Sequence, residues 1–124
     1  MWAEARADIL KALANPTRIY IVDLIHREGE QCVQDITRRV GVDTSTISRH
    51  LAQLKNAGIL QDRKTGTSVY YSLNCNCIGE FMDILENVLL AKRDRDHRFF
   101  EALRPGNTRV SSSPVNYQQE TSQT

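Results

Sequence analysis

The middle of the chain constrains the fold most strongly, because its hydrophobic period changes there from helical to extended. "EQCVQDITRRVGV" begins with a short extended stretch and continues as a short helix closed by Gly41. "DTSTISRHLAQLKNAGIL" predicts another helix, with Asp43 or Thr44 as its N-cap and Gly58 at its end. "ILQDRKTGTSVYYSL" then alternates with period two around a turn at 64–67, which predicts a β-hairpin. Two short helices followed by a hairpin make a winged helix-turn-helix.

Two further helices precede this segment. The first is expected over Trp2–Ala14, and Asn15 is expected to cap a second helix that has Pro16 in its first turn and ends at Gly29. The expected core face of the second helix consists of Ile19, Val22, Leu24 and Ile25, and that of the fourth helix consists of Ile47, Leu51 and Leu54.

A last helix is expected from Cys77 to Leu103, with one long apolar face formed by Ile78, Phe81, Leu85, Val88 and Leu89. Such a face needs a cover, and a second copy of the chain is the simplest one. The predicted fold class is therefore mostly α with a small β-hairpin wing, in a homodimer formed through the first and last helices. Residues 105–124 are polar and rich in Ser, Gln and Thr, so we expect a disordered tail after a single domain of residues 1–104.

Composition narrows the function. No segment approaches the roughly 20 apolar residues that span a bilayer, and the acidic start lacks an apolar secretory core, so we expect a cytoplasmic protein. Three cysteines in a reducing compartment argue for free or ligating thiols instead of disulfides. The sequence contains no nucleophile–base pair, phosphate-binding loop or paired-carboxylate motif, so we expect no enzyme.

The fourth helix has the residues of a DNA reader. Its outward side chains are short hydroxyls and planar or cationic donors, which suit phosphates and base edges in a major groove. They are Thr44, Ser45, Thr46, Ser48, Arg49, His50 and Gln53. Between residues 44 and 68 there are four Lys or Arg residues against one acid, a local charge of +3 in a chain whose net charge is +1. This asymmetry favours a duplex-binding face over an ordinary solvated helix.

The chain resembles the ArsR/SmtB family of metal- and metalloid-responsive repressors over about residues 9–90. "LKALANPTRIYIVDLI" is similar to the family's opening signature, and "EQCVQDI" is similar to its Glu-Leu-Cys-Val-Cys-Asp-Leu stretch. "STISRHLAQLKNAGIL" and "DRKTGTSVYYSL" are close to its recognition helix and wing. The resemblance implies a homodimer that releases operator DNA when an inducer binds, with Arg63, Lys64 and Thr67 of the wing on the DNA backbone or minor groove.

The chain also departs from the family pattern. Gln34 replaces the second cysteine of the third-helix pair. Where some members begin a zinc site on the last helix with Asp-x-His, this chain has Cys75 and Cys77. Val88 and Ala91 lie where the other zinc ligands would be, which excludes a tetrahedral zinc site of that kind.

Cys75 and Cys77 suggest a soft-ion site, because thiolates select soft ions and the start of a helix favours the thiolate form. A direct disulfide between residues two apart is expected to be strained. If "QCV" pairs with "VYYSL", Cys32 approaches the same junction, and the three sulfurs would suit arsenite or antimonite as inducer.

Three alternatives stay open at this point. Cys32 could be a buried small residue with no ligand role. The protein could sense cadmium or lead, or could switch through a redox bond between Cys32 and one of the pair. In a different class, the hairpin and the apolar helix could bind another protein without any DNA role.

Overall fold

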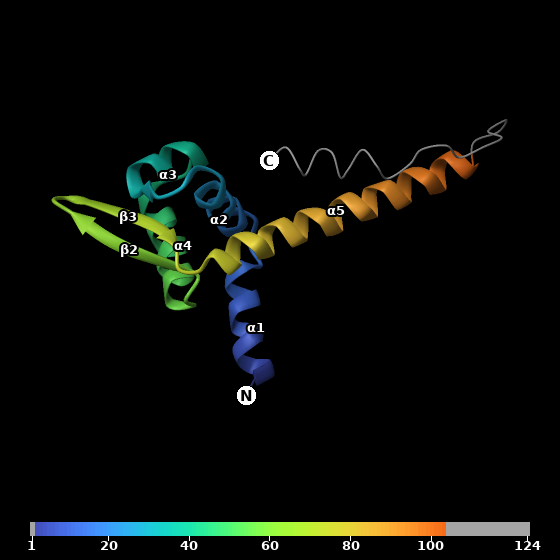
Figure 1. Cartoon of the computed structure of the whole chain (residues 1–124). Helices are drawn as coiled ribbons and strands as arrows, with labels where there is room; N and C mark the ends of the chain where they lie inside the picture. Colours follow the sequence, from blue (N-terminus) through green and yellow to red (C-terminus); the bar gives the residue numbers. More distant parts are fainter. Residues whose placement is uncertain (1, 104–124) are drawn as a thin grey trace. The chain divides into compact units, whose positions relative to one another are not determined.

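The computed structural model describes residues 2–103 of the 124-residue chain (Figure 1). The elements in order are α1 (Trp2–Leu13), α2 (Pro16–Glu28), β1 (Gln31–Cys32), α3 (Val33–Val40), α4 (Thr44–Asn56), β2 (Leu60–Thr65), β3 (Ser68–Leu73) and α5 (Asn76–Leu103). The chain divides into two compact units at Met82, within α5, and we call residues 2–82 the winged-helix unit. The expected tail of residues 105–124 lies outside the described residues.

Local capping sets the helix boundaries close to the expected positions. The side chain of Asn15 accepts hydrogen bonds from the backbone N–H groups of Thr17 (2.9 Å) and Arg18 (3.1 Å), and Pro16 begins α2. Gly41 ends α3 in a left-handed conformation with φ of 85°, where a side chain would be strained. The expected helices are therefore confirmed to within one or two residues.

The core of the winged-helix unit lies between α2, α3, α4 and the sheet. Ile47, Leu51 and Leu54 of α4 are fully buried, as expected. The expected face of α2 was wrong at one position, because Ile19 is 37% exposed and Ile21 is buried in its place. At about 100° per residue, Ile19 points away from the side that Ile21, Val22, Leu24 and Ile25 share.

The three strands form an antiparallel sheet in the order β1-β3-β2. Strands β2 and β3 pair from Leu60 opposite Leu73 to Thr65 opposite Ser68, so the turn consists of Gly66 and Thr67 and is shorter than the expected 64–67. Gly66 has a φ of 62°, which suits the first central position of a two-residue hairpin turn. The short turn keeps Lys64 on the paired part of the wing.

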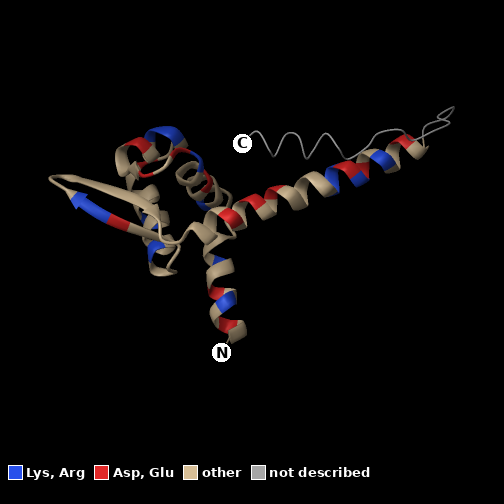
Figure 2. Cartoon of the chain, in the orientation of Figure 1, with Lys and Arg blue, Asp and Glu red and all other residues tan. Residues whose placement is uncertain are grey.

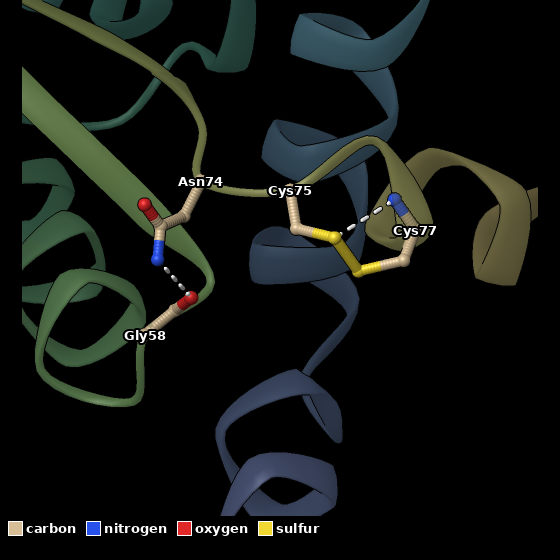
Figure 3. Close-up of a disulfide and its surroundings, with 4 residues drawn as sticks. All are labelled: Gly58, Asn74, Cys75 and Cys77. Atoms are coloured by element: carbon tan, nitrogen blue, oxygen red, sulfur yellow. Dashed lines mark hydrogen bonds between the residues drawn. A yellow bond between two sulfur atoms is a disulfide. The ribbon is translucent and has the colours of Figure 1, made fainter.

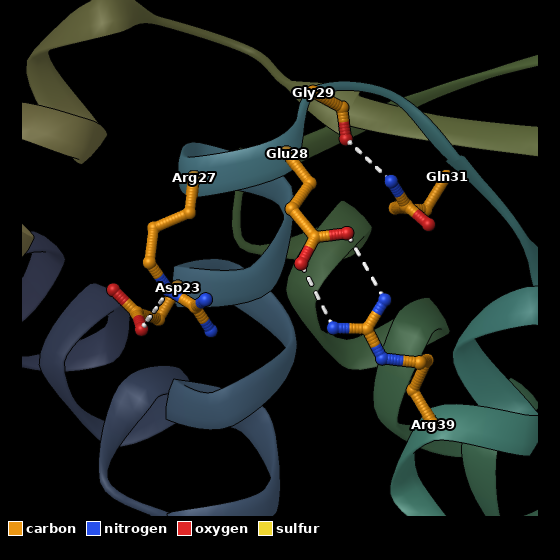
Figure 4. A network of polar contacts seen from close by, with 6 residues as sticks. All are labelled: Asp23, Arg27, Glu28, Gly29, Gln31 and Arg39. Atoms are coloured by element: carbon orange, nitrogen blue, oxygen red, sulfur yellow. Dashed lines mark hydrogen bonds and ion pairs between the residues drawn. The ribbon is translucent and has the colours of Figure 1, made fainter.

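Charged contacts fasten α3 to the end of α2 (Figure 4). Arg39 donates both terminal nitrogens to the carboxylate of Glu28, at 3.0 and 2.8 Å. Along α2, Arg27 pairs with Asp23 at 2.8 Å, and the side chain of Gln31 donates to the carbonyl of Gly29. The contact between Arg39 and Glu28 holds α3, the first helix of the helix-turn-helix, against the end of α2.

Large apolar side chains outside this core lie on α1 and α5. On α1, Ile9 and Leu10 are 43% and 53% exposed, and on α5 beyond Met82 the exposed apolar residues are Ile84, Val88, Leu89, Phe99, Phe100 and Leu103. No helix among residues 2–103 is long and apolar enough to cross a membrane. Both helices therefore offer uncovered apolar surface, and on α5 this surface includes Val88 and Leu89 of the expected face.

Candidate functional site

Helix α4 turns the expected reader residues away from the core. Thr44, Ser45, Ser48, Arg49 and Gln53 are exposed, whereas Thr46 and His50 are half-buried. The buried residues of α4 fix this orientation, because they lie on the opposite side of the same helix. The helix therefore presents a polar face next to the wing, as a DNA reader requires.

Two of the expected reader residues also serve the helix cap. Asp43 accepts hydrogen bonds from the hydroxyl of Ser45, from the hydroxyl of Thr46 at 2.7 Å and from the backbone N–H of Thr46 at 3.0 Å. These donors lower the pKa of Asp43 to about 2. The hydroxyl protons of Ser45 and Thr46 are thereby used within the protein, and the other exposed residues of this face remain as donors for DNA.

His50 is hydrogen-bonded to Arg18 of α2 and is not a fully exposed residue of the polar face of α4. The Nε of Arg18 donates to Nδ1 of His50 at 3.0 Å, and an Nη of Arg18 donates to the carbonyl of Ala12 at 3.3 Å. An arginine keeps its proton, so Nδ1 must be unprotonated and the neutral ring carries its proton on Nε2. Burial, followed by the charges of Arg18 and Arg49, lowers the pKa of His50. Only the Nε2–H group of His50 is left for DNA.

Basic and acidic residues both lie on the wing strand β2 (Figure 2), and the basic side chain of Arg63 is paired. Arg63 makes two hydrogen bonds of 2.9 Å to the carboxylate of Glu30, one of 2.7 Å to the hydroxyl of Thr65, and a cation–π contact with Tyr70. The pKa of Glu30 is lowered chiefly by this hydrogen bonding. Lys55 pairs with Asp62 at 3.1 Å. Lys64 and Thr67 stay exposed at the tip.

The two neighbouring cysteines, which were expected to be free or ligating thiols, are joined as a disulfide (Figure 3). Cys75 precedes α5 and Cys77 is in its first turn, so the backbone bends between them and brings their Cα atoms to 5.1 Å, an ordinary disulfide separation. The backbone N–H of Cys77 also donates to the sulfur of Cys75 at 3.1 Å. Two sulfurs that reach each other can, once reduced, bind the same atom.

Cys32 does not join them within one chain. Strand β1 does pair with β3, as expected, but the register places Cys32 opposite Tyr70, and the strand continues for three residues, about 10 Å, before it ends at Leu73. The thiol of Cys32 instead donates to Asp35 and, with Arg38, lowers the pKa of Asp35. In residues 2–103, no three His, Cys, Asp or Glu side chains lie together as a metal site. The described residues therefore do not bring Cys32, Cys75 and Cys77 together as the expected site within one chain.

A short linker connects the thiol pair to the reader helix (Figure 3). The backbone N–H of Asn74 donates to the carbonyl of Ile59 at 3.0 Å, and its side chain donates to the carbonyl of Gly58 at 3.1 Å. Gly58 and Ile59 lie two and three residues after Asn56, the last residue of α4, and Asn74 directly precedes Cys75. Asn74 thus connects Cys75, through its two hydrogen bonds, to the segment that follows α4.

Three residues with clear structural roles were absent from the sequence-based site: Arg18, Glu30 and Asn74. Each acts on a partner at least 16 positions away, so no local spacing marks it. The only signal for Arg18 was its place in the "ANPTR" segment, where it was interpreted as part of a family signature.

Comparisons with known proteins agree with this geometry. A sequence model described as "Bacterial regulatory protein, arsR family" matches residues 15–62. An arsenic resistance transcriptional regulator of Pseudomonas putida is 50% identical over 66 residues, which are 53% of this chain and 52% of that protein, so the chain spans about half of that relative's length. A homologue of a cadmium resistance transcriptional regulatory protein, from Staphylococcus aureus, is 39% identical over 71% of this chain and 70% of that protein.

Among solved structures, a homodimeric winged helix-turn-helix DNA-binding domain from Mycobacterium bovis, a possible ArsR-family transcriptional regulator, matches with a TM-score of 0.66. It is 31% identical, and the match covers 71% of this chain and 81% of that domain. These relatives are regulators and not enzymes, which confirms the expected winged helix-turn-helix and the expected absence of an enzymatic function.

Proposed function

Because the chain belongs to the ArsR family of bacterial regulatory proteins, we propose that it is a homodimeric repressor that leaves its operator DNA when arsenite or antimonite binds its thiols. As a transcriptional regulator it would work in the cytoplasm, where the DNA is. The observation that carries the proposal is the joint presence of a polar face on α4 and a pair of converging sulfurs, which Asn74 connects by hydrogen bonds to the segment that follows α4.

The DNA-binding surface consists of the polar face of α4 and the tip of the wing. Thr44, Ser48, Arg49 and Gln53 are exposed donors on α4, and arginine and glutamine are suited to base edges. Lys64 and Thr67 would contact the DNA backbone or minor groove. Ser45 and Thr46 would contribute mainly by holding the N-terminus of the helix, whose N–H groups favour a phosphate.

A dimer is supported by the uncovered apolar residues of α1 and α5, and by the homodimeric domain from Mycobacterium bovis. A two-fold dimer places two reader helices on one face, where half-sites are about 34–36 Å apart. The apolar residues that water would otherwise contact would then lie between the two copies.

Cys75 and Cys77 are the proposed inducer site, with Cys32 outside it. Soft ions prefer thiolates, and relatives include regulators of both arsenic and cadmium resistance. Arsenite or antimonite therefore comes first, and cadmium or lead is the alternative within the same site. Formation of the Cys75–Cys77 disulfide is a further alternative signal, in place of a bond to Cys32.

Release of DNA would follow from movement at Asn74, which connects the cysteine pair to the segment after α4. An ion bound to both sulfurs changes the backbone between Asn74 and the first turn of α5, and the hydrogen bonds of Asn74 pass that change to Gly58 and Ile59. A preference of about 1–3 kcal/mol for the DNA-incompetent form is enough for an inducer. Because both half-sites must be occupied together, a small shift of each reader helix spoils docking.

A gel shift of the reduced protein on its own promoter DNA, at two salt concentrations, tests the DNA claim. A repressor binds tightly, and its affinity falls steeply with salt because counterions are released from the duplex. A flat or absent response would favour the other class of function, a winged-helix module that binds proteins and not DNA.

A further inference from the structure

Helix α5 is attached to the rest of its own chain by a small contact. Over Asn76–Leu103 the buried residues are Gly79 and Met82. Both lie in the part of α5 that belongs to the winged-helix unit, and Gly79 is two residues after Cys77. The position of α5 on that unit therefore depends on what packs against its first two turns.

The imidazole ring of His26 occupies the space in front of Gly79. A Cβ atom at position 79 would lie 2.3 Å from Nδ1, 2.5 Å from Cε1 and 3.2 Å from Cγ of this ring. All three distances are shorter than a van der Waals contact of about 3.5–4.0 Å. The other four glycines among residues 2–103 have no atom within 4 Å of such a Cβ, so the close approach is particular to Gly79. His26 can pack on the α5 backbone because residue 79 has no side chain.

Helix α2 connects this contact to the reader helix. His26 is in the last turn of α2, and Arg18, about two turns earlier, donates to Nδ1 of His50 on α4 at 3.0 Å. Between these two residues, α2 is held in the core by its buried apolar side chains. A rigid helix transmits a displacement from one end to the other, so a shift at His26 would reach His50.

We propose that the packing of His26 on Gly79 is a positioning contact, which holds the start of α5 where DNA binding requires it and passes a shift of α5 through α2 to α4. The inference rests on the proposed function, because the cysteine pair at the start of α5 is the proposed inducer site. It adds a second connection to the one that Asn74 makes with the segment after α4. Neither His26 nor Gly79 belongs to the thiol pair or to the proposed DNA-binding surface.

Gly79→Ala tests the position of α5 without any inducer. The new methyl group would overlap the ring of His26, so α5 or the ring must move. Alanine is a better helix former than glycine, so a loss of DNA binding could not come from a weaker helix. In fluorescence anisotropy with labelled operator and the reduced full-length chain, Gly79→Ala should bind at least about fivefold more weakly than the wild type.

The double variant His26→Ala/Gly79→Ala is the rescue. It removes the ring that the new methyl group meets, so its operator affinity should return to within about twofold of the wild type. Equal affinities of Gly79→Ala and the wild type would overturn the proposal. A loss of affinity that His26→Ala does not reverse would also overturn it, because the overlap with His26 would then not be the cause.

His26→Ala alone tests the transmission of the inducer signal. It keeps glycine at position 79 and creates no overlap, so it should bind operator like the wild type. The ratio of its operator affinities without and with arsenite should be at least about fivefold smaller than the wild-type ratio, since one connection is lost. Arg27→Ala, at the exposed neighbour of His26 that pairs with Asp23, is the matched control and should keep the wild-type ratio. A wild-type ratio in His26→Ala would contradict the proposal.

The two measurements separate this inference from the proposed function. A wild type that binds operator but is not released by arsenite would refute the inducer, and the affinity of Gly79→Ala would then decide the role of the contact. If circular dichroism shows that Gly79→Ala does not fold, the affinity ratio of His26→Ala decides it. Unchanged values in every variant of a wild type that binds DNA and is released would refute the contact alone.

Discussion

The winged-helix core buries its large apolar residues, whereas helices α1 and α5 leave several of theirs exposed. In α4, Leu51 and Leu54 are fully buried within one chain, whereas on α5 Val88 and Leu89 are 59% and 62% exposed. The first region gains its stability from its own packing. The second carries as much hydrophobic character but lacks a cover in a single chain. The difference indicates that folding and dimerisation are separate properties of this protein, and that each can be altered alone.

The largest effect is expected from a core truncation. Leu51→Ala should lower the free energy of unfolding by about 2–5 kcal/mol, because it removes buried methyl groups and leaves a cavity. Leu89→Ala should leave the unfolding of the monomer almost unchanged and should weaken self-association. Urea denaturation and sedimentation equilibrium measure the two quantities. If Leu89→Ala destabilised the dilute monomer as much as Leu51→Ala does, the two regions would not be separable.

The next largest effect is expected on operator binding, at the exposed face of α4 in the winged-helix unit. Arg49→Ala should weaken operator binding by about 1–3 kcal/mol without changing the fold, since Arg49 is exposed on α4. Arg95→Ala, which removes an exposed cation outside the winged-helix unit, is the matched control and should bind normally. Fluorescence anisotropy with labelled operator measures both. Equal affinities for the Arg49 variant and the control would show that the reader face was assigned incorrectly.

A pH dependence should arise from the contact between α2 and α4. The pKa of His50 is lowered below its usual 6.5 by burial, and further by Arg18 and Arg49, so the folded state favours the neutral ring. In that case the unfolded chain binds more protons between the two pKa values, and stability falls as the pH decreases through this window. The His50→Gln variant should lose the part of the pH dependence of stability that comes from this ring.

The pH dependence of stability is measured from the melting temperatures of the wild type and His50→Gln at several pH values between 7.5 and 5. The difference between the two curves of melting temperature against pH isolates the contribution of His50. The wild type should lose more stability than His50→Gln as the pH falls below about 6.5. Parallel curves would mean that the Arg18–His50 hydrogen bond has no part in stability.

The smallest effect is expected at the wing. Glu30→Gln should release Arg63 from its carboxylate partner and add about one phosphate contact, so the slope of log affinity against log salt should steepen by about one unit. Glu86→Gln removes one exposed carboxylate outside the winged-helix unit and should leave the slope unchanged. An unchanged slope in the Glu30 variant would place Arg63 away from the DNA.

Sequence reasoning located the helices and the hairpin well because their signals are local. Asn15, Asp43 and Gly41 act on residues within four positions, so a cap can be recognised without knowledge of the rest of the fold. The reader residues followed from the same helical period that buries Ile47, Leu51 and Leu54. Within single helices the expected core faces agree with the structure except on α2, where Ile19 was expected in the core and Ile21 is buried instead.

Contacts between distant segments were predicted less well. The pairing of β1 with β3 was anticipated, but its register was not, and that register separates Cys32 from the other thiols. The +3 charge of the reader segment omitted Glu30, which lies 33 positions from Arg63 and neutralises it. Register and long-range ion pairs depend on how elements pack, which hydrophobic period does not encode.

Cys75 and Cys77 are proposed to convert inducer binding into release of DNA. Titration of the reduced protein–operator complex with arsenite, followed by gel shift, tests it most directly when the wild type is compared with Cys32→Ser, Cys75→Ser and Cys77→Ser. All four proteins are expected to bind operator. Arsenite should release the wild type and Cys32→Ser, whereas Cys75→Ser and Cys77→Ser should stay bound. Release of the Cys75 and Cys77 variants at the wild-type arsenite concentration would contradict it.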